Sequence, residues 1–219
     1  HRQRCEPHAP TDRPGSRGRD HQPDGSTSPD YFDRLGHGTA VSAAIRERAP
    51  GADLLVVKVF DWAPTASVET LVSAIDWAAR QQADLINLSL GTTLPGHARL
   101  LRQAVDDASR AGVLLVAARA HDGVAYLPGS LPGVVPVELD SGCRRLDVTV
   151  EDRDDGPPTC RASGYPRPMP EASSENELSG LSLAVANVPV VLARELRAGE
   201  RASATTARVF SYQSTRLIA

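Results

Sequence analysis

The middle of the chain alternates short, nearly continuous apolar runs with stretches in which apolar residues recur every three or four positions. The runs are typical of buried parallel strands, and the three-to-four spacing is typical of amphipathic helices that cover them. This alternation predicts an α/β fold, a three-layer α/β/α domain on a mainly parallel sheet. The predicted strands are 53–60, 85–88, 113–117 and 134–139, and the predicted helices are 41–48, one capped by Ser67, one around 101–108 that stops near Gly112, and one from about 183.

Length and charge agree with one domain of this kind. The 219 residues carry 24 basic and 27 acidic side chains, a formal net charge of −3. No basic excess argues for a nucleic-acid partner. No apolar run is long enough to span a bilayer, and no charged-then-apolar leader opens the chain. We therefore expect no nucleic acid and no membrane among its partners, and a cytoplasmic location.

Three segments lie outside the alternating pattern. Residues 1–30 are polar and rich in proline and glycine, which predicts a loop or disordered lead-in before a domain at 31–200. Residues 140–178 contain two proline-rich stretches and predict a long surface excursion, in which only 146–150 has the alternation of a strand. Residues 201–219 are expected to form a C-terminal extension.

The cysteines and histidines predict neither a disulfide framework nor a metal site. Cys143 and Cys160 could pair in an oxidising compartment, but two reduced thiols are the favoured interpretation. Cys5, the third cysteine, leaves an odd number. Cys5, His8 and His21 have the residue types of a zinc site, yet one Cys-x-x-His pair without a second is a weak signal. We expect no metal and no cofactor.

Two short strings place a reactive side chain among glycine and other small residues. His37 lies in Gly-His-Gly-Thr-Ala-Val at 36–41, and Ser182 lies in Ser-Gly-Leu-Ser-Leu-Ala-Val-Ala at 179–186. A nucleophilic serine needs a neighbouring base to take its proton, and small flanking residues let a substrate backbone come close. His37 and Ser182 are therefore a candidate base and nucleophile. The alternatives are an ordinary polar histidine at a helix start and a serine that caps a helix.

Together with three further segments, these strings resemble the subtilisin-like serine peptidases. The five segments, in the family's order, are 36–41, 57–61, 84–91, 127–135 and 180–184, and the resemblance covers roughly residues 33–195. It implies a subtilisin-like fold and hydrolysis of peptide bonds through an acyl-enzyme. It also implies that His37 is the general base, that Ser182 is the nucleophile, and that the substrate backbone lies extended along Ser89, Leu90 and Gly91.

One departure from the family concerns the donor to the oxyanion. Subtilisin-like enzymes usually carry an asparagine there. When Asp122 and Gly123 are aligned with the residues that usually follow, His121 falls where the asparagine belongs. An imidazole N–H can donate to an oxyanion, so the resemblance makes His121 a candidate donor. The open alternative is that His121 is a loop residue without this role.

The other departure is the aspartate that orients the catalytic histidine. In the family it ends the first core strand, and in this chain it would fall at or just before His1. Asp33 is only four residues from His37, on the wrong side of a tight motif for that role. We infer that the chain starts after the strand, so a companion fragment could supply both. Because that strand lies inside the sheet, either something fills the gap and pairs the neighbouring backbone groups, or the fragment is only marginally stable.

Three functions follow from these observations and stay open at this point. The first is a serine endopeptidase weakened by the missing aspartate. The second is a catalytically inactive relative that keeps the groove for peptide binding or assembly, because a fold can outlive its chemistry. The third is a dedicated processing protease for one partner substrate. A polypeptide is the expected partner in each.

Overall fold

The computed structural model describes residues 16–21, 27–28, 33, 35–60, 63, 65–145, 147–154, 156–165, 180–198 and 216–218. The strands are β1 (Ser16–His21), β2 (Thr27–Ser28), β3 (Asp53–Lys58), β4 (Leu85–Leu88), β5 (Leu114–His121), β6 (Val124–Ala125), β7 (Val134–Leu139), β8 (Val148–Glu151), β9 (Thr159–Ala162) and β10 (Arg216–Ile218). The helices are α1 (His37–Arg48), α2 (Val68–Arg80), α3 (Ala98–Arg110) and α4 (Leu181–Ala198), with a 3₁₀ turn, η1, at Pro95–His97.

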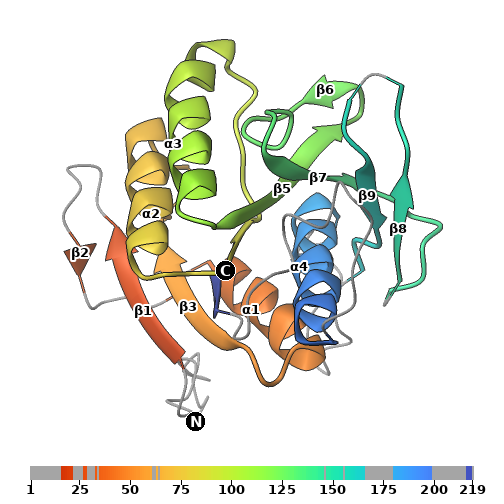
Figure 1. Ribbon diagram of the computed structural model, residues 1–219, viewed down its shortest axis with the longest axis horizontal. Helices are drawn as coiled ribbons and strands as arrows, with labels where there is room; N and C mark the ends of the chain where they lie inside the picture. Colours follow the sequence, from red (N-terminus) through yellow and green to blue (C-terminus); the bar gives the residue numbers. More distant parts are fainter. Residues whose placement is uncertain are drawn as a thin grey trace, which may run out of the picture.

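One mainly parallel sheet separates two layers of helices, so the predicted three-layer α/β/α fold is confirmed (Figure 1). The strand order is β2-β1-β3-β10-β4-β5-β7-β9-β8, and β6 pairs with β5. Successive residues of a strand point to opposite faces. Leu85 and Val116 accordingly pack in the core under α1 and α4, whereas Ile86 and Leu115 pack in the core under α2 and α3.

The elements with clear apolar patterns form close to where they were predicted. Strands β4 and β7 have the predicted bounds, and β3 and β5 differ from prediction only at their ends. Helix α2 begins after Ser67, whose hydroxyl accepts a hydrogen bond from the Thr70 N–H at 3.1 Å. Helix α3 ends just before Gly112, which has a positive φ of 81°. Local signals were sufficient for these elements because each buries its own apolar face.

Three expectations about segments outside the pattern were wrong. Within the predicted lead-in, β1 runs parallel to β3, from Ser16 opposite Leu54 to Asp20 opposite Lys58. Within the predicted excursion, β9 runs parallel to β7 where no strand was expected. Strand β8, which pairs with β9 in antiparallel fashion, confirms the strand predicted at 146–150 except at its ends. Backbone groups pair β1 with β3 and β9 with β7, so these pairings need no apolar alternation in the sequence. The excursion's strands therefore extend the sheet.

The third wrong expectation concerns the C-terminal extension, which contributes β10 to the middle of the sheet. Strand β10 lies between β3 and β4 and runs parallel to both. Leu217 is opposite Leu54 and Leu85, and Ile218 is opposite Leu55 and Ile86. The gap predicted at the centre of the sheet is thus filled, over these residues, by the far end of the same chain (Figure 1).

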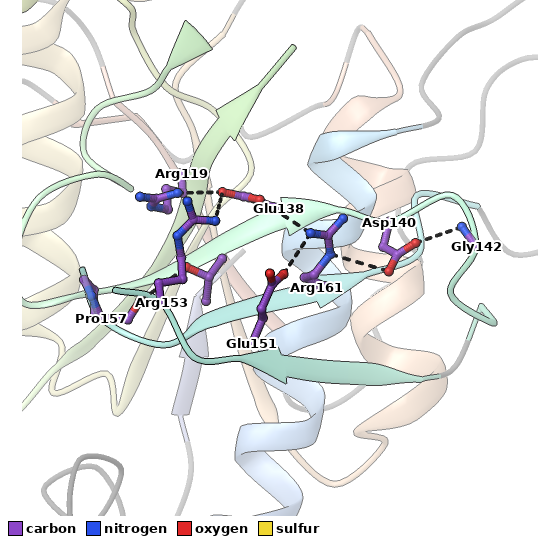
Figure 2. Close-up of polar contacts among 9 residues, drawn as sticks. Arg119, Glu138, Asp140, Gly142, Glu151, Arg153, Pro157 and Arg161 are labelled. Atoms are coloured by element: carbon purple, nitrogen blue, oxygen red, sulfur yellow. Dashed lines mark hydrogen bonds and ion pairs between the residues drawn. The ribbon is translucent and has the colours of Figure 1, made fainter. Parts of the chain in front are cut away.

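Charged side chains link the last strands of the sheet on the face opposite α4 (Figure 2). Val137 and Leu139 belong to the core under α4, so the intervening Glu138 points to the other face. Glu138 accepts from Arg119 at 2.8 Å, and Arg161 donates to Glu151 at 2.9 Å. The ion-pair network consists of Arg119, Glu138, Asp140, Glu151, Arg153 and Arg161. It ties β5, β7, β9 and β8 together where their polar face is half-exposed.

Some expectations concern features away from the sheet. Cys143 and Cys160 are both free thiols, and burial raises the pKa of Cys160 to about 11. Cys5 and the proline-rich stretch at 166–170 lie outside the described residues. None of the helices described has the length and apolarity needed to cross a bilayer.

A close backbone contact joins the exit of β9 to the start of α4. The Gly180 N–H donates to the Gly164 carbonyl at 2.9 Å. A Cβ on Gly164 would lie 2.5 Å from the Gly180 Cα and 2.7 Å from the Gly180 carbonyl oxygen. No side chain fits at that distance, so Gly164 lets α4 begin against the end of β9.

We predict that Gly164→Ala lowers the free energy of unfolding by about 1–3 kcal/mol, because the clash is with backbone that must shift. Gly156→Ala is the matched control, since a Cβ there meets nothing within 4 Å. Denaturant titration of both variants measures the difference. Equal, small losses would show that the contact is not tight.

Candidate active site

His37 is the first residue of α1 and lies near the carboxyl end of β3. Gly36 precedes it with a positive φ of 76°, which turns the chain sharply into the helix. The imidazole packs edge-on against Phe60, with ring centroids 6.5 Å apart. Burial lowers the pKa of His37, and the negative charge of Asp33 acts in the opposite direction. The half-buried ring is therefore mostly neutral at pH 7 and able to accept a proton.

Asp33 holds the first turn of α1. One carboxylate oxygen accepts from the backbone N–H of Leu35 at 3.1 Å and of Gly36 at 2.8 Å. The other accepts from the Thr39 N–H at 2.7 Å and the Thr39 hydroxyl at 2.8 Å. Burial acts to raise the pKa of Asp33, but these hydrogen bonds outweigh it and the pKa is lowered. Both oxygens are occupied by the helix terminus, so Asp33 has a structural task there.

Ser182 is the second residue of α4 and is joined reciprocally to Ser89. The Ser182 hydroxyl donates to the Ser89 carbonyl at 3.1 Å, and the Ser89 hydroxyl donates to the Ser182 carbonyl at 2.8 Å. Helix α4 already begins at Leu181. The alternative in which Ser182 caps a helix from about 183 is therefore wrong. The pair of bonds fixes the first turn of α4 against the end of β4.

The segment Ser89–Leu90–Gly91 leaves β4 beside a second extended stretch. Thr92 and Leu127 exchange two backbone hydrogen bonds of 2.9 and 2.8 Å. A Cβ on Gly91 would lie 2.9 Å from the Leu127 carbonyl oxygen, so glycine is required for this approach. The structure thus brings the predicted substrate segment and the predicted nucleophile together through Ser89.

His121 is the last residue of β5, in a tight hairpin with β6. It pairs with Val124 across a turn made by Asp122 and Gly123, which have positive φ of 48° and 77°. Its Nε2 lies 3.5 Å from a carboxylate oxygen of Asp122, and 41% of the side chain is exposed. The structure therefore gives His121 a carboxylate neighbour, and its role toward Ser182 stays a prediction.

Asn87 is a residue near this site that sequence reasoning missed. It is buried within β4, and its amide donates to the Ser89 hydroxyl at 2.9 Å. Its Oδ1 is buried without a hydrogen-bond partner in the described part of the chain. The available signal was an asparagine in an otherwise apolar strand, Leu-Ile-Asn-Leu, because a buried amide needs partners.

These side chains occupy the end of the sheet where ligands bind in open α/β folds, beyond the carboxyl ends of the parallel strands. Helices α1 and α4 pack against each other and begin with the His37 and Ser182 segments. No cluster of three or more His, Cys, Asp or Glu suited to a metal occurs within the described ranges. The structure thus places a hydroxyl and a mostly neutral imidazole at the starts of two packed helices. The contact it shows for the Ser182 hydroxyl is with Ser89, and the contact it shows for the His37 ring is with Phe60.

Comparisons with known proteins identify the family. A model of the subtilase family, peptidase S8, matches residues 7–143, and the chain belongs to that family. The minor extracellular protease Epr of Bacillus subtilis (strain 168) is 36% identical over 129 residues, which are 53% of this chain but only 20% of that protein. The chain thus spans a fifth of the length of this curated relative.

Solved structures agree on the fold. The S41 psychrophilic protease superposes with a TM-score of 0.61 at 22% identity, covering 87% of this chain and 72% of that one. The prenylagaramide maturation protease PagA superposes with a TM-score of 0.53 at 25% identity, covering 73% of this chain and 63% of that one. The predicted subtilisin-like fold is confirmed.

We predict that Asp33→Asn destabilises the protein by about 1 kcal/mol at pH 7, because the amide nitrogen that replaces one carboxylate oxygen cannot accept the hydrogen bonds from Thr39. Because folding lowers the pKa of Asp33, the carboxylate contributes fully to the free energy of unfolding at pH values above the ordinary aspartate pKa of 3.8. This contribution is lost as the pH falls through the lower, folded-state value. The difference in free energy of unfolding between the variant and the unmodified chain should therefore become smaller in acid. Denaturant titrations at pH 7 and in the acid range measure it, with Asp106→Asn, at an exposed position of α3, as the control. A difference that did not change with pH would contradict the assignment.

Proposed function

We propose that this chain is a serine endopeptidase domain that hydrolyses peptide bonds through an acyl-enzyme. Ser182 is the nucleophile and His37 the general base. The observation that carries the proposal is the reciprocal Ser182–Ser89 pair, which holds the hydroxyl beside the predicted substrate segment. The subtilase family match supports the same reading.

The proposed chemistry begins with the extended substrate along Ser89, Leu90 and Gly91. The Ser182 proton passes to the neutral His37 imidazole as Oγ attacks the scissile carbonyl. The His121 imidazole N–H donates to the oxyanion that forms. His37 then gives its proton to the leaving amine, and water hydrolyses the acyl-enzyme by the same steps. For the attack, the Ser182 hydroxyl must turn away from the Ser89 carbonyl, where it donates in the structure.

The charge balance at His37 indicates that this domain is a slow catalyst without a further carboxylate. Taking the serine proton makes His37 cationic, and burial already disfavours that form. Asp33 is committed to the start of α1. A missing orienting carboxylate lowers turnover by roughly 10⁴ in well-studied serine peptidases. We therefore include in the proposal a companion segment that supplies the carboxylate.

The proposed place for that segment is between β3 and β4, where it would take the position that β10 occupies in the structure. Beyond the last pairs of β10, at Ile218, β3 continues to Lys58 and β4 continues to Leu88. Asn87, whose Oδ1 has no hydrogen-bond partner among the described residues, is the first residue of β4 past those pairs. An extended segment that reached one or two residues further than β10 would bring a side chain to this level, next to the end of β4.

A dedicated processing role is the second candidate. It is favoured by the 25% identity to PagA, whose name describes a maturation protease. In that role the same site would act on one polypeptide partner. Profiling with a peptide library separates the two, because a dedicated protease cleaves few of its members. An inactive, peptide-binding relative is the outcome if Ser182 does not react at all.

The nucleophile is tested by labelling with a fluorophosphonate. We expect the adduct on Ser182 and its complete loss in Ser182→Ala. The free energy of unfolding should change by less than about 1 kcal/mol, since one hydrogen-bonding hydroxyl is removed. The exposed Ser130→Ala is the control and should label normally. Labelling that survived in Ser182→Ala would place the nucleophile elsewhere.

The missing carboxylate is tested by extending the chain. An apolar strand ending in aspartate is joined ahead of His1, and a second version ends in asparagine. We expect the aspartate version to turn over a peptide ester about 10³- to 10⁴-fold faster than the asparagine version or the 219-residue chain. Equal rates in all three would argue against a missing carboxylate.

A further inference from the structure

A buried polar bridge joins α1, α4 and the end of β9. The Arg48 guanidinium donates to the Asn187 side-chain Oδ1 at 3.1 Å and to the Asn187 backbone carbonyl at 3.3 Å. The Asn187 amide donates to the Ser163 carbonyl at 2.8 Å. Arg48 is 6% exposed, Asn187 4% and Ser163 0%. We call these three residues the Arg48–Asn187–Ser163 bridge.

Among the described residues, α1 and α4 also contribute apolar side chains to one core. Helix α4 contributes alanine at two core positions, and α1 contributes Ala44 beside Val41 and Ile45. Such surfaces permit close approach, but apolar contacts are adaptable and tolerate small shifts along the helix axes. The bridge is directional, and its bonds form only within a narrow range of distances and angles.

Breaking the bridge would be costly. A guanidinium and an amide buried at this depth lose their hydration, so they are tolerated only where hydrogen bonds replace it. Sliding α1 along α4 would separate the Arg48 donors from both oxygens of Asn187. Asn187 is central, because it is the member that contacts both of the others.

Two further contacts connect the bridge to the helix starts and to the neighbouring loop. Ser163 precedes Gly164, which holds the start of α4 through Gly180. At the far end of α1, Glu47 makes two hydrogen bonds with Arg145, of 2.8 and 3.0 Å. The carboxyl end of α1 is therefore tied to α4 and to the loop before β8. His37 is at the opposite end of this helix.

We propose that Asn187 is a positioning residue that holds α1 and α4 in the one axial register in which their first turns present His37 and Ser182 at the same edge of the sheet. Asn187 contacts neither side chain and acts through the placement of the two helices. The catalytic meaning of this register rests on the proposed function, but the register itself does not.

The test compares Asn187→Leu and Asn187→Asp with Val105→Ala. Leucine removes every side-chain bond of Asn187, whereas aspartate keeps the acceptors for Arg48 and loses the donor to Ser163. Val105 is fully buried on α3 under the other face of the sheet, so its truncation destabilises the fold without touching the bridge. Denaturant titration establishes that each variant is folded under the assay conditions.

Two readouts then separate positioning from stability. The first is the titration midpoint of the His37 imidazole by nuclear magnetic resonance, which depends on its burial and on Asp33 and requires no activity. In the Asn187 variants we expect it to move toward the ordinary value of 6.5, more for leucine than for aspartate. The second is the rate of fluorophosphonate labelling at Ser182, expected to fall roughly 10- to 100-fold. Val105→Ala should change neither.

If the Asn187 variants match Val105→Ala in the His37 titration, the proposal is overturned, whether or not Ser182 labels. If the midpoint moves only in the Asn187 variants while the unmodified chain fails to label, the peptidase proposal fails and the positioning role stands. Movement of the midpoint together with slowed labelling supports both.

Discussion

Backbone pairing at the centre of the sheet is the constraint on which the rest of the structure depends. The segments that follow β3 and β4 contact the two candidate catalytic residues. Phe60, after β3, packs against His37, and Ser89, after β4, is hydrogen-bonded to Ser182. The spacing of β3 and β4 is set by whichever strand lies between them, because buried backbone groups must be paired. In this chain β10 makes those pairs over a short length. The strand in the middle of the sheet thus sets the distance between the segments that hold His37 and Ser182.

The two side chains proposed for catalysis, His37 and Ser182, are held by different kinds of interaction. His37 is placed by the hydrogen bonds of Asp33 to the first turn of α1 and by contact with Phe60, which follows β3. Both residues are close to His37 in the sequence. Ser182 is placed by hydrogen bonds to Ser89, far away in the chain. The first depends on local folding of α1, and the second exists only once α4 has docked on the sheet. The Arg48–Asn187–Ser163 bridge connects these two arrangements.

The predictable part of the fold was the part that buries continuous apolar runs. Strands β4 and β7 and helix α2 could be predicted from the sequence, because their own side chains form the core. Strands β1 and β10 do not, because they join the sheet through backbone bonds to partners that only the tertiary fold provides. Of the candidate site, His37 and Ser182 were predicted from the order of motifs within a family resemblance. The same resemblance predicted the Ser89 segment beside Ser182, but not the Arg48–Asn187 contact, which spans 139 positions and which nothing local encodes.

The contact between Gly164 and Gly180 also closes a loop. Its two ends meet at one point, where the Gly180 N–H reaches the Gly164 carbonyl at 2.9 Å. Whatever residues connect them, the entropy of joining fixed ends grows only slowly with length, by about 0.6 kcal/mol for each doubling. The connecting sequence can therefore lengthen or change over generations while Ser182, two residues past the junction, stays where it is. The junction separates a segment open to variation from a helix start that is not.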